Sequence, residues 1–227
     1  MSDPVTEPVS GPVSGPANPT ALLLDLDGTL VDSEPIHQAA YRAFFEQRGW
    51  EVPDLTMFTG RRAEDVFVVE PGPWAGHDPA ALSAEVMALV HAGEDPQPVA
   101  GAVALIAAAA RYDVPLAVVT SAGPDWVNRA VGGTLDALHH LEVIVTRDDV
   151  VAGKPDPAGY LLACSQLGVD AAGAMAVEDS PAGVRAALDA GVGQVVGVST
   201  THDADELTAA GAHVVLPDLT DLVDLLR

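Results

Sequence analysis

The stretch TALLLDLD, residues 20–27, is an unbroken apolar run that ends in carboxylates. A strand that is apolar at almost every position is buried on both faces, which is typical of a parallel sheet covered by helices. Because such a strand needs partners on both sides, this run constrains the fold more than any other feature. Similar runs recur at residues 114–121, 141–146, 174–179, 195–200 and 212–216.

Helical patterns separate most of these apolar runs. Alternating strand and helix predicts the α/β class, with a doubly wound, Rossmann-like and mainly parallel sheet. In this class the ligand site lies at the carboxyl ends of the strands. The helical patterns cover residues 103–112, 158–168, 181–191 and 203–211.

The alternation breaks between residues 34 and 98, where the sequence shows helical stretches and no convincing strand. These stretches cover residues 36–48, 63–69 and 79–91. We therefore predict an α-helical cap subdomain over residues 34–98, inserted into an α/β core formed by residues 20–33 and 99–227. Residues 1–19 are rich in proline and repeat Pro-Val-Ser-Gly in tandem. Such a segment cannot bury enough surface to fold, so a disordered tail is predicted there.

The chain is strongly acidic, with 33 Asp and Glu against 10 Lys and Arg and a formal net charge of −23. This charge argues against nucleic acids and anionic membranes as partners.

No segment approaches the ~18 to 20 apolar residues of a membrane helix. The first 41 residues lack Lys and Arg, so a secretory signal would have no positive region. Cys164, the single cysteine, falls in an apolar helical pattern and suits a reducing compartment. We expect a cytoplasmic protein, monomeric by default, with Cys164 in the core.

Polar residues stand at the ends of the apolar runs. Two carboxylates close the first run, two hydroxyl residues close the second and two more carboxylates close a later one: Asp25, Asp27, Thr120, Ser121, Glu178 and Asp179. Lys154, the only lysine in the chain, precedes a predicted helix. A parallel sheet brings its strand ends to one edge, so we expect these groups to share one pocket.

Four crowded carboxylates repel one another in a poorly solvated site. A hard divalent cation relieves this repulsion, and Mg²⁺ suits carboxylates combined with a substrate phosphate. Four carboxylates, one Mg²⁺ and the Lys154 ammonium together would give the site a formal charge of about −1. An ammonium is a compact charge that can touch a carboxylate and a phosphoryl oxygen together, whereas a planar guanidinium would be too wide. A phosphate dianion could enter such a site only with further help from backbone N–H groups, from protonation of one aspartate or from another cation.

Four segments carry a family resemblance: DLDGTLVDSEP, VVTSA, GKPDPAGY and VEDSPAGVRAA. They resemble the ordered motifs of the haloacid dehalogenase-like superfamily, over a similarity that runs from about Leu22 to Leu216. The resemblance implies that Asp25 is the nucleophile that forms an aspartyl-phosphate. It implies that Asp27 is the general acid and base, and that Lys154 pairs with Asp25 and the phosphoryl group.

The resemblance also implies roles for the remaining strand-end residues. Thr120, with the backbone at Ser121, would hold the phosphoryl oxygens. Asp179 would bind Mg²⁺ together with Asp25 and the Asp27 carbonyl. Glu178 would either bind Mg²⁺ directly or contact a residue that binds it.

Single positions discriminate between the branches of this superfamily. Dehalogenases lack an aspartate two residues after the nucleophile, and this chain has Asp27. Phosphonatases need a second lysine, which the chain lacks.

The favoured function is a phosphatase for a small sugar or polyol phosphate, such as glycerol phosphate or a hexose phosphate. The alternative enzyme is a β-phosphoglucomutase-like isomerase. His37 matches a mutase histidine that related phosphatases share, but Ala63 stands where the mutases have a phosphate-binding arginine. A phosphosugar sensor without catalysis is a third possibility, but it would be expected to have lost Asp25, Asp27 or Asp179.

The predicted cap offers two arginines as further substrate ligands, Arg61 and Arg62. The competing interpretation is a solvated helix start in which they pair with Glu64 or Asp65. Trp74 and His77 lie in a proline-rich loop of the same region. For these two we favour a packed tryptophan and a surface histidine over residues that line the pocket.

Overall fold

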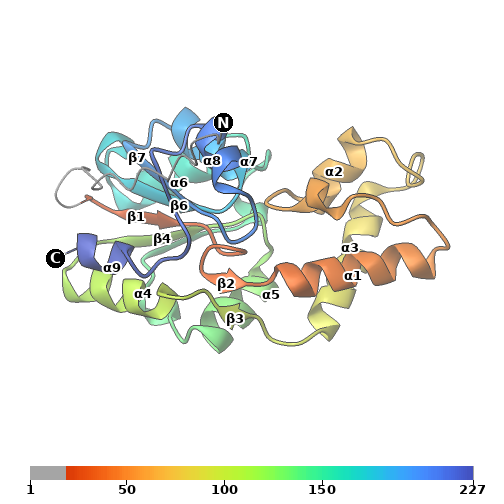
Figure 1. The fold of residues 1–227 in the computed structure, drawn as a ribbon, viewed down its shortest axis with the longest axis horizontal. Coiled ribbons are helices and arrows are strands. Elements are labelled where there is room, and N and C mark those ends of the chain that lie inside the picture. Colours follow the sequence, from red (N-terminus) through yellow and green to blue (C-terminus); the bar gives the residue numbers. More distant parts are fainter. Residues whose placement is uncertain (1–18, 227) are drawn as a thin grey trace, which may run out of the picture.

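The computed structural model describes residues 19–226, and within that range six parallel strands form the main sheet (Figure 1). The order across the sheet is β5-β4-β1-β6-β7-β8, which confirms the predicted doubly wound α/β fold. The strands are β1 (Leu22–Leu24), β4 (Leu116–Val119), β5 (Val143–Val145), β6 (Met175–Glu178), β7 (Gln194–Val198) and β8 (Val214–Leu216). Of the predicted disordered tail, residues 1–18 lie outside the described range.

Strand β1 lies at the centre of the sheet, paired with β4 on one side and β6 on the other. After β1 the chain adds β4 and β5 on one side and then returns to add β6, β7 and β8 on the other. A crevice opens at the carboxyl ends of the strands where the winding direction reverses. The ends of β1, β4 and β6 therefore meet at the place where this fold class binds its ligands.

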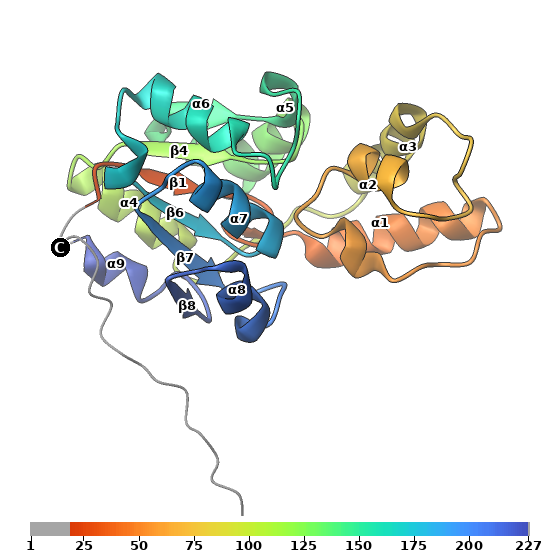
Figure 2. The same ribbon diagram turned by 90° about the horizontal axis from the view of Figure 1, so that it is seen from above.

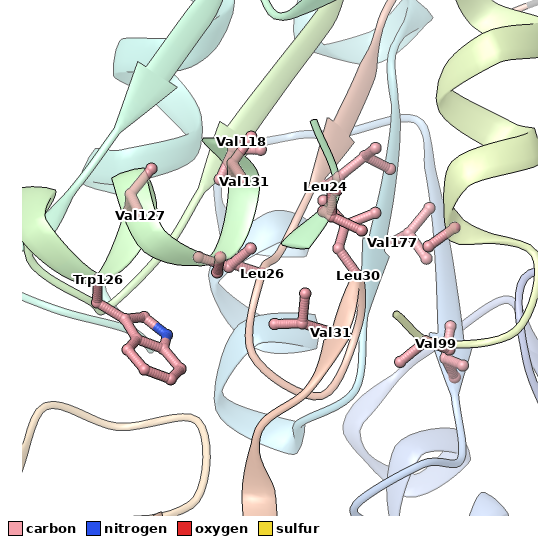
Figure 3. Close-up of a cluster of buried hydrophobic side chains, with 14 of the residues drawn as sticks. Leu24, Leu26, Leu30, Val31, Val99, Val118, Trp126, Val127, Val131 and Val177 are labelled. Atoms are coloured by element: carbon pink, nitrogen blue, oxygen red, sulfur yellow. The ribbon is translucent and has the colours of Figure 1, made fainter. Parts of the chain in front are cut away.

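The side chains of β1 alternate between two hydrophobic clusters, one on each face of the sheet. Leu22 and Leu24 join the cluster that includes α4, α5 and α9, whereas Leu23 joins the cluster that includes α6, α7 and α8. Figure 3 shows part of the first cluster, where Leu24 lies near Val118 and Val177 of the neighbouring strands. These helices are α4 (Ala102–Arg111), α5 (Pro124–Val127), α6 (Ala158–Leu167), α7 (Pro181–Asp189), α8 (Ala204–Ala210) and α9 (Leu222–Leu225).

Three helices stand to one side of the sheet, as Figure 2 shows. They are α1 (Glu34–Gln47), α2 (Ala63–Val69) and α3 (Pro79–Ala92), and α3 packs against both of the others. Trp74 is buried among their aromatic side chains, where its ring contacts those of Phe45 and Phe67. His77 is exposed. The expected packed tryptophan and surface histidine are thus confirmed, while the subdomain boundaries stay a prediction.

A two-stranded antiparallel ribbon lies where the chain enters and leaves the three helices. It pairs β2 (Val31–Asp32) with β3 (Gln97–Pro98), although no strand was expected between residues 34 and 98. A two-residue strand leaves no periodic pattern, so the sequence does not reveal it.

The sequence also showed no sign of α5 or of the π-helical segment after it, η2 (Asn128–Thr134). Short 3₁₀ turns complete the fold: η1 (Leu55–Phe58), η3 (Leu138–His140), η4 (Arg147–Asp149) and η5 (Ala171–Gly173). None of the helices within residues 19–226 is both long enough and apolar enough to cross a bilayer.

Candidate active site

Lys154 joins three strand ends at the centre of the sheet. Its Nζ donates to Asp25 Oδ1, just after β1, and lies 2.5 Å from it. The same nitrogen lies 2.5 Å from Glu178 Oε1 at the end of β6 and donates to the carbonyl of Val119 on β4 at 3.0 Å. Asp25, Lys154 and Glu178 are all buried. The convergence expected of these residues is therefore observed, while their catalytic roles stay predictions.

Glu178 is fully buried and held from several sides. Its Oε1 accepts a 2.6 Å hydrogen bond from the Tyr160 hydroxyl on α6, and its Oε2 accepts one from Ser180 Oγ at 3.3 Å. Ser180 also caps α7 by accepting from the Gly183 N–H at 3.1 Å. Any side chain at Gly183 would collide with the Glu178 carboxylate, so glycine is required there. Glu178 therefore positions Lys154, and the hydrogen bond from Tyr160 holds the Glu178 carboxylate in place.

The buried charges shift one another's pKa values. Burial raises the pKa of Asp25 to about 7, although the neighbouring Lys154 ammonium opposes the rise. Burial also raises the pKa of Asp179, and the charges of Asp25 and Glu178 raise it further. For Lys154, burial alone would lower the pKa, but the two adjacent carboxylates outweigh it and raise the pKa. The site thus contains more negative charge than one lysine can neutralise.

The donor set at this place fits a divalent cation. Carboxylate oxygens of Asp25, Glu178 and Asp179 lie within 4.8 Å of one another, and all three residues are buried. Carboxylate oxygens with surplus negative charge are the ligands that Mg²⁺ prefers. Glu178 accepts hydrogen bonds on both of its carboxylate oxygens, from Tyr160 and from Ser180, whereas Lys154 contacts Asp25 on Oδ1, so Asp25 Oδ2 is the freer oxygen. Thr201 donates to Asp179 Oδ2 and orients that carboxylate.

Gly28 allows the loop after β1 to approach Asp179. It has a φ of +81°, in the left-handed region that glycine tolerates best. A Cβ atom at this position would also collide with the Asp179 side chain. The DLDGT segment and the VEDS segment can therefore meet only with glycine here.

The Asp27 carboxylate lies outside this acidic group. Its Oδ1 accepts hydrogen bonds from Ser33 Oγ at 2.6 Å and from Trp126 Nε1 at 2.7 Å. His37 Nε2 lies 4.0 Å from the same oxygen. Asp27 is thus oriented by residues that follow β1 and by α5, rather than by the other carboxylates.

A cavity of about 340 Å³ adjoins these residues. Asp25, Asp27, Thr120 and Ser121 line it from the sheet, and residues of α1, α2 and α3 line it from the other side. Thr120 is buried and accepts from the Ala122 N–H at 3.0 Å. Thr120 and Ser121 therefore border the space that Asp25 faces, which is the place predicted for them.

Arg61 and Arg62 also line the cavity, but both already have partners. Arg61 Nη1 forms a 2.9 Å ion pair with Glu70, not with Glu64 or Asp65 as the competing interpretation expected. Arg62 donates to backbone carbonyls of the loop before α6. That either arginine binds substrate stays a prediction.

Comparison with known proteins identifies the class. Residues 19–191 match the haloacid dehalogenase-like hydrolase family. Validoxylamine A 7'-phosphate phosphatase of Streptomyces hygroscopicus subsp. limoneus is 43% identical over 204 residues, which make up 88% of this chain and 94% of that protein. Hexitol phosphatase A of Escherichia coli (strain K12) is 34% identical over 189 residues, or 82% of this chain and 85% of that protein. The chain belongs to the haloacid dehalogenase-like hydrolase family.

Solved structures agree with this assignment. CbbY from Rhodobacter sphaeroides, in complex with phosphate, has a TM-score of 0.76 and 27% identity, and the match covers 90% of this chain and 96% of that one. A hydrolase from Pseudomonas syringae has a TM-score of 0.81 over 90% of this chain and 96% of that one, and at 24% identity it shows the fold alone. The predicted superfamily is confirmed, as is the predicted enzyme class, a phosphatase of this family.

Three residues of the site were not assigned from the sequence. Tyr160 belongs to the GKPDPAGY segment and Thr201 to a polar stretch after β7, so both stood beside recognised motifs. A tyrosine before an apolar run gives no sign that its hydroxyl reaches Glu178. Trp126 lies in α5, which the sequence did not predict at all.

Proposed function

We propose that this protein is a Mg²⁺-dependent phosphatase that hydrolyses a small sugar or polyol phosphate monoester through an aspartyl-phosphate on Asp25. The names of two relatives, a validoxylamine A 7'-phosphate phosphatase and a hexitol phosphatase, support this substrate class. The single observation that carries the proposal is the buried contact of Lys154 with both Asp25 and Glu178, beside a cavity.

In the first step, an Asp25 oxygen attacks phosphorus and the bond from phosphorus to the alcohol oxygen breaks. Asp27 donates its proton to that departing oxygen, so the alcohol leaves neutral. In the second step, Asp27 takes a proton from water while the water oxygen attacks phosphorus. This releases inorganic phosphate and restores the Asp25 carboxylate.

Lys154 neutralises Asp25 and is close enough to contact a phosphoryl oxygen bound to it. Asp25 and Asp179 would hold Mg²⁺, which when bound supplies positive charge to the phosphoryl oxygens. Thr120 and Ser121 would hold the remaining oxygens from the end of β4. Most of the catalysis in such a reaction is positioning and stabilisation of spread-out charge, and a buried site supplies both.

The test is phosphate release from a panel of sugar and polyol monophosphates, with and without Mg²⁺. We expect release that requires Mg²⁺ and that Asp25→Asn abolishes. The matched control is Asp189→Asn, which removes an exposed carboxylate at the end of α7 and should leave turnover unchanged. Binding without turnover of any ester would indicate a sensor instead.

The same panel separates the phosphatase from the mutase alternative. His37 lines the cavity, which both activities allow, but Ala63 provides no cation for a second phosphate group. Conversion of glucose 1-phosphate into glucose 6-phosphate with negligible phosphate release would favour the mutase. Free phosphate as the main product supports the proposal.

We also propose a monomer that works in the cytoplasm. Cys164, the only cysteine in the sequence, is buried and forms no disulfide, which suits a reducing compartment. Size-exclusion chromatography with light scattering tests the oligomeric state, and fractionation of cells that express the protein tests its location.

A further inference from the structure

Three arginines line the cavity, and two of them are ion-paired. Arg61 Nη1 donates to Glu70 Oε1 at 2.9 Å. Arg147 Nε lies 3.4 Å from Asp148 Oδ1. Each of these guanidinium charges is therefore already matched by a carboxylate of the protein.

Arg62, the third, reaches from the start of α2 to the loop before α6. Its Nη1 donates to the carbonyl of Val151 at 3.2 Å, and its Nη2 donates to those of Arg147 and Val150 at 3.0 Å each. These bonds direct its terminal nitrogens at the protein backbone. Arg62 therefore joins the two walls of the cavity.

Two cavity carboxylates, in contrast, have no cationic partner within residues 19–226. Glu34 Oε1 accepts only from neutral groups, Gln38 Nε2 at 2.9 Å and Thr59 Oγ1 at 3.1 Å. Glu64 is exposed at the start of α2 and forms no ion pair with any residue of that range. Among the described residues, the part of the cavity formed by α1 and α2 thus holds two carboxylates without a cationic partner, against one guanidinium, that of Arg62, which donates only to neutral backbone carbonyls.

The rest of this wall is neutral and able to form hydrogen bonds. Tyr41, Gln38 and Ser83 all line the cavity. Burial raises the pKa of Tyr41, and the nearby Glu34 carboxylate raises it further, so this hydroxyl keeps its proton at neutral pH. Such groups suit a ligand that carries many hydroxyls.

We propose that the cavity selects phosphate monoesters whose remaining part is neutral and hydroxylated or carries an ammonium group, and that it rejects esters with a second anionic group. This inference rests on the proposed function, which places the phosphate against Asp25 and Lys154. A second phosphate or carboxylate would then face Glu34 and Glu64, and like charges that face each other oppose binding. Hydroxyl and ammonium groups can donate to the same carboxylates.

The test compares esters that differ in the charge of one substituent. Glucose 6-phosphate is neutral beyond its phosphate, glucosamine 6-phosphate carries an amine, 6-phosphogluconate carries a carboxylate and glucose 1,6-bisphosphate carries a second phosphate. We expect kcat/KM for the first two to exceed that for the last two by at least about tenfold, as one opposed charge produces. Equal or faster hydrolysis of 6-phosphogluconate or of the bisphosphate would overturn the inference.

A pair of variants locates the effect. Glu64→Gln should reduce the preference for glucosamine 6-phosphate over 6-phosphogluconate by about threefold or more, because one repelling charge is lost. Glu46→Gln removes the same charge from an exposed position on α1 that does not line the cavity, and it should leave the preference unchanged. Equal changes in both variants would assign the selectivity to the net charge of the protein and overturn the inference.

A binding measurement separates this inference from the proposed function. If no ester releases phosphate, the phosphatase proposal fails. The rise in Tm that each ester gives in the Asp25→Asn variant still reports selectivity. A larger rise with glucose 6-phosphate and glucosamine 6-phosphate supports the charge selection, and an equal or larger rise with 6-phosphogluconate or glucose 1,6-bisphosphate refutes it.

Discussion

Trp126 Nε1 donates a 2.7 Å hydrogen bond to Asp27 Oδ1, across 99 positions of sequence. The indole is buried beside His37, with the two ring centroids 5.4 Å apart. Ser33 Oγ donates to the same carboxylate oxygen. Two donors on one oxygen fix the direction of the other, which is the oxygen that would exchange a proton with the substrate in the proposed mechanism.

Trp126→Phe should therefore slow turnover while the protein stays folded. A hydrogen bond to a charged group contributes about 1.5 to 3 kcal/mol, so we expect kcat to fall by about tenfold to hundredfold. The loss should be smaller with p-nitrophenyl phosphate, whose leaving group needs little protonation. An equal loss with both kinds of ester, together with a lowered Tm, would indicate a purely structural role for Trp126.

Lys154→Arg should cause a severe loss of rate without unfolding. The ammonium fits between Asp25 and Glu178 and also donates to Val119, and a planar guanidinium cannot make these contacts in the same space. Removing one stabilising donor from such a site costs about a hundredfold to a thousandfold in kcat. Steady-state kinetics with circular dichroism checks this. A near-normal rate would show that only the charge matters at this position.

Added Mg²⁺ should raise the Tm of the protein. Binding stabilises the folded state by about 2.7 kcal/mol at a hundredfold excess over Kd. The rise should be lost in Asp179→Asn and kept in Asp189→Asn, which leaves the buried acidic group intact. A rise that persists in Asp179→Asn would place the cation elsewhere.

Cys164 should react slowly with alkylating reagents in the folded protein. The side chain is 5% exposed, and burial raises the pKa of its thiol, so little reactive thiolate forms near neutral pH. Mass spectrometry after treatment with iodoacetamide measures the protection, with urea-unfolded protein as the control. Rapid labelling of the folded chain would contradict its assignment to the core.

Arg62→Ala should loosen the contact between α2 and the loop before α6. Three hydrogen bonds to carbonyls are lost at once. Hydrogen–deuterium exchange should rise in residues 60–63 and 147–153, while exchange in β1 stays slow because that strand is buried at the centre of the sheet. Unchanged exchange in both segments would show that the remaining contacts hold them together.

The parts of the fold that follow a regular pattern could be predicted from the sequence. The strands of the main sheet lie inside or within one residue of the predicted runs, because strands buried on both faces read as continuous apolar segments. Helix α5 has four residues, too few for a 3.6-residue period to emerge. The contacts of Trp126, Tyr160 and Thr201 depend on how distant segments fold together. No local pattern records such contacts.

The acidic group was predictable for a related reason. Carboxylates that end buried strands must meet once the strands align in parallel, and Lys154 was conspicuous as the only lysine. The partners of Arg61 and Arg62 were not predictable, since Glu70 and the carbonyls near Val150 meet them only in the folded chain.

The β2–β3 ribbon makes the segment with α1, α2 and α3 an exchangeable module. Because Asp32 and Gln97 are paired, the chain leaves and rejoins the core at one point. A different helical segment could be spliced between these two residues without shifting the register of any strand in the main sheet. Substrate range can therefore diverge within such a scaffold while the phosphoryl-transfer apparatus is inherited unchanged.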